Sequence, residues 1–225
     1  EGILQVAAKD VSVITAVSVA AGVDTNSEGV AVGGVFSFAP VDSTTEAIIR
    51  QKEGVDEKLD IKANHLLLFA TDDHRERLWS FGGGCGKIAG GAMVLSWGSF
   101  DGASTRALIQ NVDAAIGRSA NIQSSSTLDA TFIAAGASGG GKVSATGMVN
   151  YINFNNLVQT EIEGSALTIK DADGKFTAKS TGTRLFTDGV GALSIGLGSS
   201  ASVGGALSLI YVGGNGSDDT NLTQT

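Results

Sequence analysis

The chain is poor in the residues that hold many small extracellular proteins together. Its 225 residues include one proline and one cysteine, Cys85, so a framework of intramolecular disulfides is excluded. Aromatic residues make up 6% of the chain, too few for a core built around large rings. Lys and Arg number 15 against 23 Asp and Glu, and no basic cluster is present to neutralise a phosphate backbone. Nucleic acid is therefore not an expected partner.

Long apolar runs and sustained helical patterns are also missing. The longest apolar stretch, residues 11–23, is interrupted by Ser12, Thr15 and Ser18 and falls short of the roughly 20 residues of a membrane-spanning helix. Apolar residues do not recur at helical spacing, and glycine interrupts most candidate helices. We expect no transmembrane helix. The start at Glu1, without methionine or signal peptide, predicts processing upstream.

Glycine and small or branched apolar residues are abundant. The chain contains 32 glycines and is 42% hydrophobic, which is enough for a sizeable core. Small and β-branched side chains suit narrow, stacked β layers. The composition therefore predicts an all-β protein.

Four glycines mark an internal repeat. Each ends a pair of small residues and precedes an alternating apolar segment, and their successive spacings are 57, 56 and 58 residues. Constant spacing without close identity is typical of repeat architectures. We interpret residues 1–212 as one repetitive domain of about four units and residues 213–225 as a polar tail. The repeat-turn glycines are Gly34, Gly91, Gly147 and Gly205, and the strands that they lead lie near 30–38, 89–97, 142–154 and 201–212.

Two architectures are compatible with this pattern. In a parallel β-solenoid, each unit of about 57 residues is one coil, and strands stack about 4.8 Å apart around an apolar interior. The alternative is an antiparallel β-barrel or sandwich, including an outer-membrane barrel. Scarce aromatics cannot form two interfacial girdles, and the period is long for a two-strand unit. We therefore predict the solenoid, with residues 3–23 as two strands around a turn at Lys9-Asp10.

The repeated segments resemble a known class of surface proteins. They are similar to the repetitive passenger regions of large bacterial surface adhesins and autotransporters of the filamentous-haemagglutinin kind. The resemblance is compositional and periodic, covers most of residues 1–212, and carries no catalytic residue across. It implies an extracellular or cell-surface β-solenoid with a role in adhesion or in a fibre. The matching segments are Val6-Ala7-Ala8, Ala20-Ala21-Gly22, Val30 to Gly34 and Thr45 to Ile48.

Two glycine-rich motifs invite a nucleotide or calcium interpretation. Residues 136–142 match the first part of a phosphate-binding loop, but Val143 replaces the Ser or Thr that would hold Mg²⁺. Residues 82–87 occupy the same place in the preceding unit, so we interpret both segments as repeat turns. Residues 213–218 resemble one copy of a calcium-binding nonapeptide, a motif that works through stacked copies. Asp218 and Asp219 are the resulting weak calcium candidates, and no other cofactor is predicted.

The most charged part of the second unit is residues 71–77. Its composition predicts a solvated loop, and a loop that differs from its neighbours is also a candidate for recognition. His65 and His74 are nine residues apart, which matches no familiar metal-ligand spacing. No metal site is predicted there. The recognition-loop candidates are Asp72, Asp73, His74 and Arg75.

No catalytic residue is predicted. Cys85 lies in a glycine-rich segment with no base assigned to it, and the paired carboxylates fall in turns. The sequence therefore predicts a non-enzymatic extracellular module, either a segment of a surface adhesin or a self-assembling filament subunit. Its expected partners are further copies stacked end to end, or a cell-surface receptor or glycan.

The alternative is a polysaccharide-binding or polysaccharide-active solenoid. This hypothesis predicts a groove lined with aromatic and acidic side chains. Trp79, Trp97, Tyr151 and Tyr211 are dispersed along the sequence, which does not favour such a groove.

Overall fold

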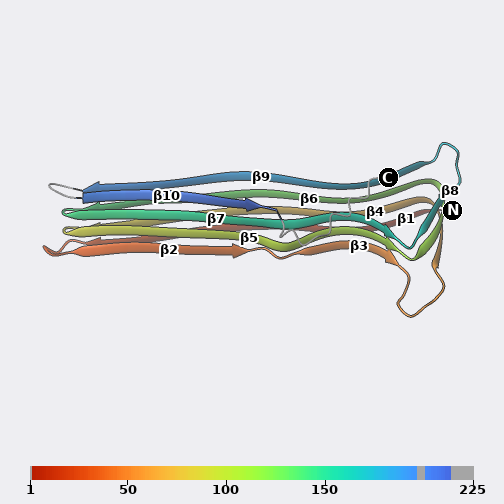
Figure 1. Ribbon diagram of the computed structural model, residues 1–225, viewed down its shortest axis with the longest axis horizontal. Coiled ribbons are helices and arrows are strands. Elements are labelled where there is room, and N and C mark those ends of the chain that lie inside the picture. Colours follow the sequence, from red (N-terminus) through yellow and green to blue (C-terminus); the bar gives the residue numbers. More distant parts are fainter. Residues whose placement is uncertain (1, 197–200, 214–225) are drawn as a thin grey trace.

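The computed structural model describes residues 2–196 and 201–213 and is built from long strands (Figure 1). No helix occurs in this part of the chain, so none is present there that could cross a membrane. The expectation of an all-β protein is confirmed. The strands are β1 (Ile3–Asp24), β2 (Val30–Pro40), β3 (Thr44–Arg50), β4 (Leu59–Gly86), β5 (Ala89–Gln110), β6 (Val112–Gly140), β7 (Val143–Glu163), β8 (Ala166–Ile169), β9 (Lys175–Gly196) and β10 (Ala201–Val212).

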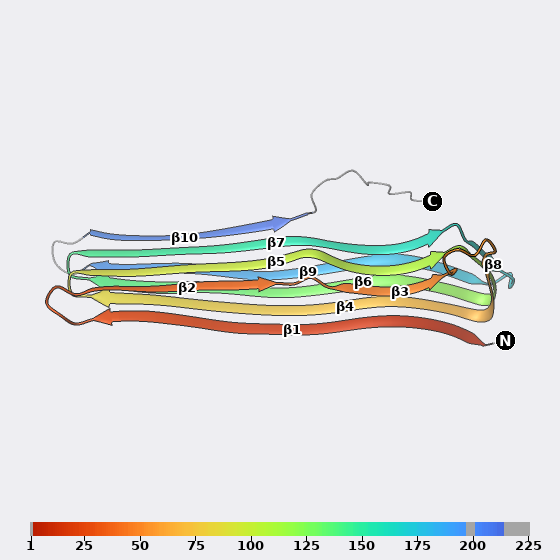
Figure 2. The ribbon, with the colours of Figure 1, turned by 90° about the horizontal axis from the view of Figure 1, so that it is seen from below.

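The strands form two sheets. In the first sheet the order is β1-β4-β6, and both β8 and β9 pair with β6; in the second the order is β10-β7-β5, and both β2 and β3 pair with β5. Every pairing among the described strands is parallel, so the antiparallel alternative is wrong for them. The chain passes back and forth between the sheets (Figure 2), an arrangement compatible with a β-solenoid.

Several connections between the sheets are short and turn sharply. One residue, Asn111, separates β5 from β6 and has a φ of 54°, and Gly164 follows β7 with a φ of 55°. Left-handed backbone is tolerated by Gly and by Asn, whose short side chain bonds locally. The sequence thus places suitable residues where the chain reverses from the second sheet into the first.

The four repeat glycines lie inside strands rather than in turns, so that assignment is wrong. Gly147 pairs in register with Gly205, whereas Gly34 lies opposite Met93 and Gly91 opposite Val32. The spacing along the chain includes connections as well as strands, and the connection between β3 and β4 is longer than the later ones. Although Gly34 and Gly91 are spaced like the later glycines in the sequence, they therefore do not lie opposite each other in the sheet.

Two further turn assignments are corrected by the strand lengths. Lys9 and Asp10 lie within β1, where they pair with Thr71 and Asp72 of β4, so residues 3–23 form one strand and not two. Of the segments 82–87 and 136–142, residues 82–86 and 136–140 are the last residues of β4 and β6, and only residues 87 and 141–142 lie in the connections to the next strands. Because neighbouring strands pair throughout these segments, the extended backbone continues through glycine and charged residues that would otherwise favour a turn.

The space between the sheets is filled by apolar clusters. The first cluster includes Leu66, Leu68 and Ile122. The second includes Leu78, Leu128 and Phe132, and a small third cluster contains Val94, Ala134 and Met148. Along β4, the first and second clusters are separated by residues 71–77, and this gap holds the charged side chains described next.

Candidate functional site

The charged segment 71–77 forms the middle of β4, so its assignment as a solvated loop is wrong. Asp72, His74 and Glu76 face inward and are 1%, 3% and 1% exposed. Asp73 and Arg75 face outward and form an ion pair at 3.5 Å. Strands β1 and β6 flank β4 and hold this segment extended. Of the four recognition candidates, two are therefore on the surface and two are buried.

Neighbouring strands extend the polar group around Asp72 and His74. In the first sheet, Asp10 lies beside Asp72 and Ser12 beside His74. From the opposite side, Ser43, in the connection between β2 and β3, contacts His74, and the hydroxyl of Thr105 in β5 donates to Asp72 at 3.5 Å. We call this group of inward-facing side chains the polar layer; it consists of Asp10, Ser12, Ser43, Asp72, His74 and Thr105.

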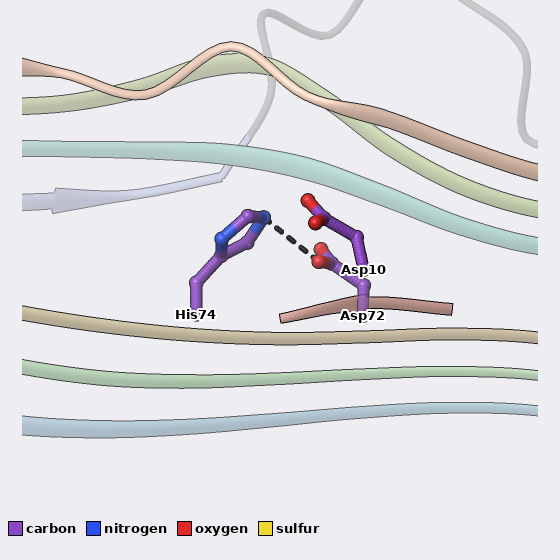
Figure 3. A group of neighbouring side chains, drawn as sticks. All are labelled: Asp10, Asp72 and His74. Atoms are coloured by element: carbon purple, nitrogen blue, oxygen red, sulfur yellow. Dashed lines mark ion pairs between the residues drawn. The ribbon is translucent and has the colours of Figure 1, made fainter. Parts of the chain in front are cut away.

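Both ring nitrogens of His74 are engaged in the polar layer. Nδ1 is hydrogen-bonded to Ser12 Oγ, and Nε2 lies 2.7 Å from Ser43 Oγ. Nε2 also lies 2.8 Å from Asp72 Oδ1 (Figure 3). The approach to Asp72 is an ion pair, since Oδ1 accepts no well-directed hydrogen bond. The contact with Asp72 raises the pKa of His74 above its usual 6.5 against the opposing effect of burial, and the charge of Asp10 adds to this.

An irregularity in the second sheet positions the polar layer. Residues 41–43 lie between β2 and β3, and in β5 the register shifts between Asp101 and Ala103, where Gly102 has a φ of 90°. A bulge of this kind redirects the side chains around it. Ser43 can therefore reach His74 from a segment that belongs to no strand.

Glu76 is buried without any hydrogen-bond partner for its side chain. Neither carboxyl oxygen has a hydrogen-bond partner, and its neighbours on the adjacent strands are Ile14 and Ala130. Burial raises the pKa of Glu76 to about 8, although the charge of His74 acts in the opposite direction. The side chain is therefore mostly neutral at pH 7. Alternation at 72, 74 and 76 is the sequence signal that could have identified an inward charged face.

Three of these side chains have the composition of a metal site. One ligand atom each from Asp10, Asp72 and His74 lies within 4.8 Å of the other two. Two carboxylates and an imidazole are suitable ligands for a divalent metal ion. Ser12, His74 and Asp72 also have the order of a nucleophile, base and acid, but three surface hollows of about 460 to 500 Å³ are lined by other residues. The layer is an interior feature rather than part of a cleft.

The remaining predicted site residues are not brought into this layer. His65 is on the same strand, but its Nδ1 is hydrogen-bonded to Ser119 Oγ at 2.8 Å. Cys85 is an exposed free thiol near the end of β4. The calcium candidates Asp218 and Asp219 lie outside the described residues.

Aromatic side chains gather on the outer face of the second sheet. Phe38, Trp97 and Tyr151 lie opposite one another on β2, β5 and β7, with ring centroids 6.0 Å and 4.9 Å apart. Phe38 is 55% exposed and Trp97 40%. These three residues are called the aromatic row below. Trp97 and Tyr151 are dispersed in the sequence but are neighbours in space, so the inference that the aromatic residues do not gather is wrong for this pair.

A shallow hollow lies on the same face. It has a volume of about 460 Å³ and is lined by Met93, Leu95, Val149 and Leu207, among others. Gly147 and Gly205 contribute no side chain to it, and a Cβ added at either would meet no atom within 4 Å. These two glycines therefore leave the outer face open here rather than forming a turn.

Comparison of the chain with family models, with curated proteins and with solved structures finds no match.

Proposed function

We propose that the chain is a segment of a β-solenoid with units of about 57 residues, and that it works as a non-enzymatic structural and adhesive module at the cell surface. The observation that supports the proposal most is that the chain passes repeatedly between two sheets, each built of parallel strands. A chain that returns to the same sheet one strand further on builds a stack in which each unit contacts only its neighbours. Such a stack is a stiff support rather than an enclosed pocket.

The outermost strands supply the means of lengthening the stack. Among the described residues, β1 and β9 each pair on one side only in the first sheet, as do β2 and β10 in the second. A parallel strand with a free edge is a template for further pairing. We propose that further copies add end to end at these edges, so that the module contributes to a filament.

The inward residues at the two ends suit such an addition. Continuing the register would bring Phe186 of one copy beside Ile14 of the next, since both belong to the row that contains Glu76 and Ala130. It would also bring Ser208, whose hydroxyl is buried without a partner, beside a second copy of Ser37. Apolar and hydroxyl rows would then continue across the junction.

Electron microscopy of concentrated protein tests this proposal. Stacked copies should give filaments with a layer line near about 4.8 Å, the spacing of paired strands. The substitution Ser208→Asp should prevent filaments because its inward charge would be buried at the junction. Leu209→Asp, on the exposed outer face of the same strand, is the matched control and should not. Discrete particles of the unaltered protein at every concentration would reject self-assembly.

A second candidate function is binding of a polysaccharide, and the aromatic row favours it. Exposed aromatic rings placed side by side offer apolar faces on which sugar rings can stack, with a polar edge at Tyr151. A glycan array is the first measurement, followed by Trp97→Ala. We expect this variant to lose at least about tenfold in affinity, while Trp79→Ala, a tryptophan on the first sheet, should bind normally. Absence of binding to every glycan would remove this candidate.

A further inference from the structure

We infer that Asp10, Asp72 and His74 form a binding site for a divalent transition-metal ion of the zinc class, which ties the edge strand β1 to β4. The ligand atoms of the three residues lie within 4.8 Å of one another. Ligands at about 2.0–2.2 Å from a common ion lie roughly 3–4 Å from one another. Small side-chain movements would therefore bring the three atoms to coordinating distance.

The arrangement of charge calls for a cation at this point. The carboxyl groups of Asp10 and Asp72 lie on adjacent strands and face the same interior. The side-chain carboxyl of Asp10 makes no hydrogen bond or ion pair with another described residue. Asp72 Oδ1, although Asp72 is 1% exposed, has the ion pair with His74 and accepts no hydrogen bond. A buried carboxylate is costly unless it is paired or coordinates a metal. His74 is the one imidazole beside them, and a metal ion would satisfy all three side chains together.

The mixed ligand set selects the class of metal. Carboxylates alone would suit calcium or magnesium, whereas an imidazole favours zinc, iron, cobalt or nickel. Ser43 Oγ, 2.7 Å from His74 Nε2, is close enough to occupy or orient a fourth position. Asp10 is only partly buried because β1 is the outermost strand of its sheet. This side of the site is the route by which an ion can enter.

The proposed ion would cross-link two successive units of the stack. Asp10 belongs to β1, and Asp72 and His74 belong to β4. The ion would therefore stabilise the attachment of β1, which pairs with one neighbour only among the described strands. The site is structural, and its effect is on the stability of the edge rather than on a reaction.

Isothermal titration calorimetry and thermal unfolding with Zn²⁺ test the site after the protein has been treated with a chelator and dialysed. The titration should show saturable binding of one ion per chain. The melting temperature should rise by about 5–10 °C when the free Zn²⁺ concentration is about a hundred times the dissociation constant. Co²⁺ should bind in the same place and give a visible absorption band. Ca²⁺ and Mg²⁺ should produce neither heat nor a shift at the same concentration.

Matched variants locate the site. Asp72→Asn and Asp10→Asn should each weaken Zn²⁺ binding at least about tenfold, whereas Asp73→Asn, on the opposite face of the same strand, should not. His65→Gln should also bind normally, which separates the site from adventitious binding to a histidine. Asp10→Asn serves if Asp72→Asn fails to fold, because Asp10 lies at the edge. Absence of saturable binding to the unaltered protein, or binding that survives in Asp10→Asn and is lost in His65→Gln, would overturn the inference.

Discussion

Inward-facing hydroxyl groups are a recurrent feature of this interior at the scale of single residues. Ser80 donates to Ser37 at 2.9 Å, and Ser96 donates to Ser80 at 2.8 Å, with all three side chains buried. Ser138 makes similar contacts with Ser144 and Thr146. Small hydroxyls can satisfy one another across a narrow space. The polar layer differs because it also contains the ionisable side chains of Asp10, Asp72 and His74, and neither carboxyl oxygen of the neighbouring Glu76 has a hydrogen-bond partner.

Glu76 should make the stability of the protein depend on pH. Its pKa is raised in the folded state from 4.5 to about 8, so the folded state favours the neutral acid. The contribution of Glu76 to the free energy of unfolding is therefore fully present below about pH 4.5, and it is lost as the pH rises through about 8. The loss is on the order of 3–5 kcal/mol, as a raised carboxyl pKa of this size implies. Glu76→Gln should remove this part of the pH dependence.

Chemical unfolding between pH 4.5 and 9, with a chelator present, measures this difference. The unaltered protein should lose stability relative to Glu76→Gln as the pH rises through about 8, and the two curves should become parallel as the pH approaches 9. Asp72 and His74 are common to both proteins, so their titration largely cancels in the comparison. Parallel curves over the whole range would show that Glu76 is not held neutral.

At the scale of the strand, alternation decides which side chains form the core. Along β4, Leu66, Leu68 and Ala70 are at most 1% exposed, while Leu67 and Phe69 between them are only partly buried. The same alternation continues through Asp72, His74 and Glu76, which is why charged residues enter the interior. Side-chain polarity does not override the period of two while both flanking strands remain paired.

Adjacent leucines of β4 offer a matched test of this alternation. Leu68→Ala removes a fully buried side chain from the first apolar cluster and should lower the free energy of unfolding by about 2–5 kcal/mol. Leu67→Ala changes the same residue type on the opposite face and should cost less than about 1.5 kcal/mol. Urea unfolding followed by circular dichroism measures both values. Equal losses would indicate that the faces of β4 are assigned incorrectly.

At the scale of the whole molecule, the stack has an inner part and two ends. Strands β4 and β6 pair on both sides in the first sheet, and β5 and β7 do so in the second. The strands at the two ends pair on one side only among the described residues. Local opening needs less free energy where fewer contacts are broken, so stability should decrease from the middle toward both ends.

Hydrogen exchange followed by mass spectrometry measures this gradient. Peptides from β4 and β6 should exchange at least about tenfold more slowly than peptides from β1 and β10. If the proposed metal site is correct, Zn²⁺ should slow exchange in β1 and leave β10 unchanged. Uniform protection along the chain would contradict the view of a stack that opens from its ends.

The sequence by itself determined the all-β class, the lack of helices among the described residues and the approximate positions of several strands. The segments expected near 30–38, 89–97 and 201–212 begin where β2, β5 and β10 begin. These features depend on local properties, namely composition, alternation and the position of glycine. The division into four units and the surface role remain predictions.

Only the tertiary structure decided the length of the strands, their register and the face that each presents. Residues 71–77 have the composition of a loop, yet pairing with β1 and β6 makes them a strand and buries Asp72 and His74. Asp10 precedes its partner Asp72 by 62 residues in the sequence, and Trp97 and Tyr151 are separated by a similar number of residues. Contacts of this kind depend on which strands pair, and a parallel pairing is set by connection lengths and neighbours rather than by local sequence.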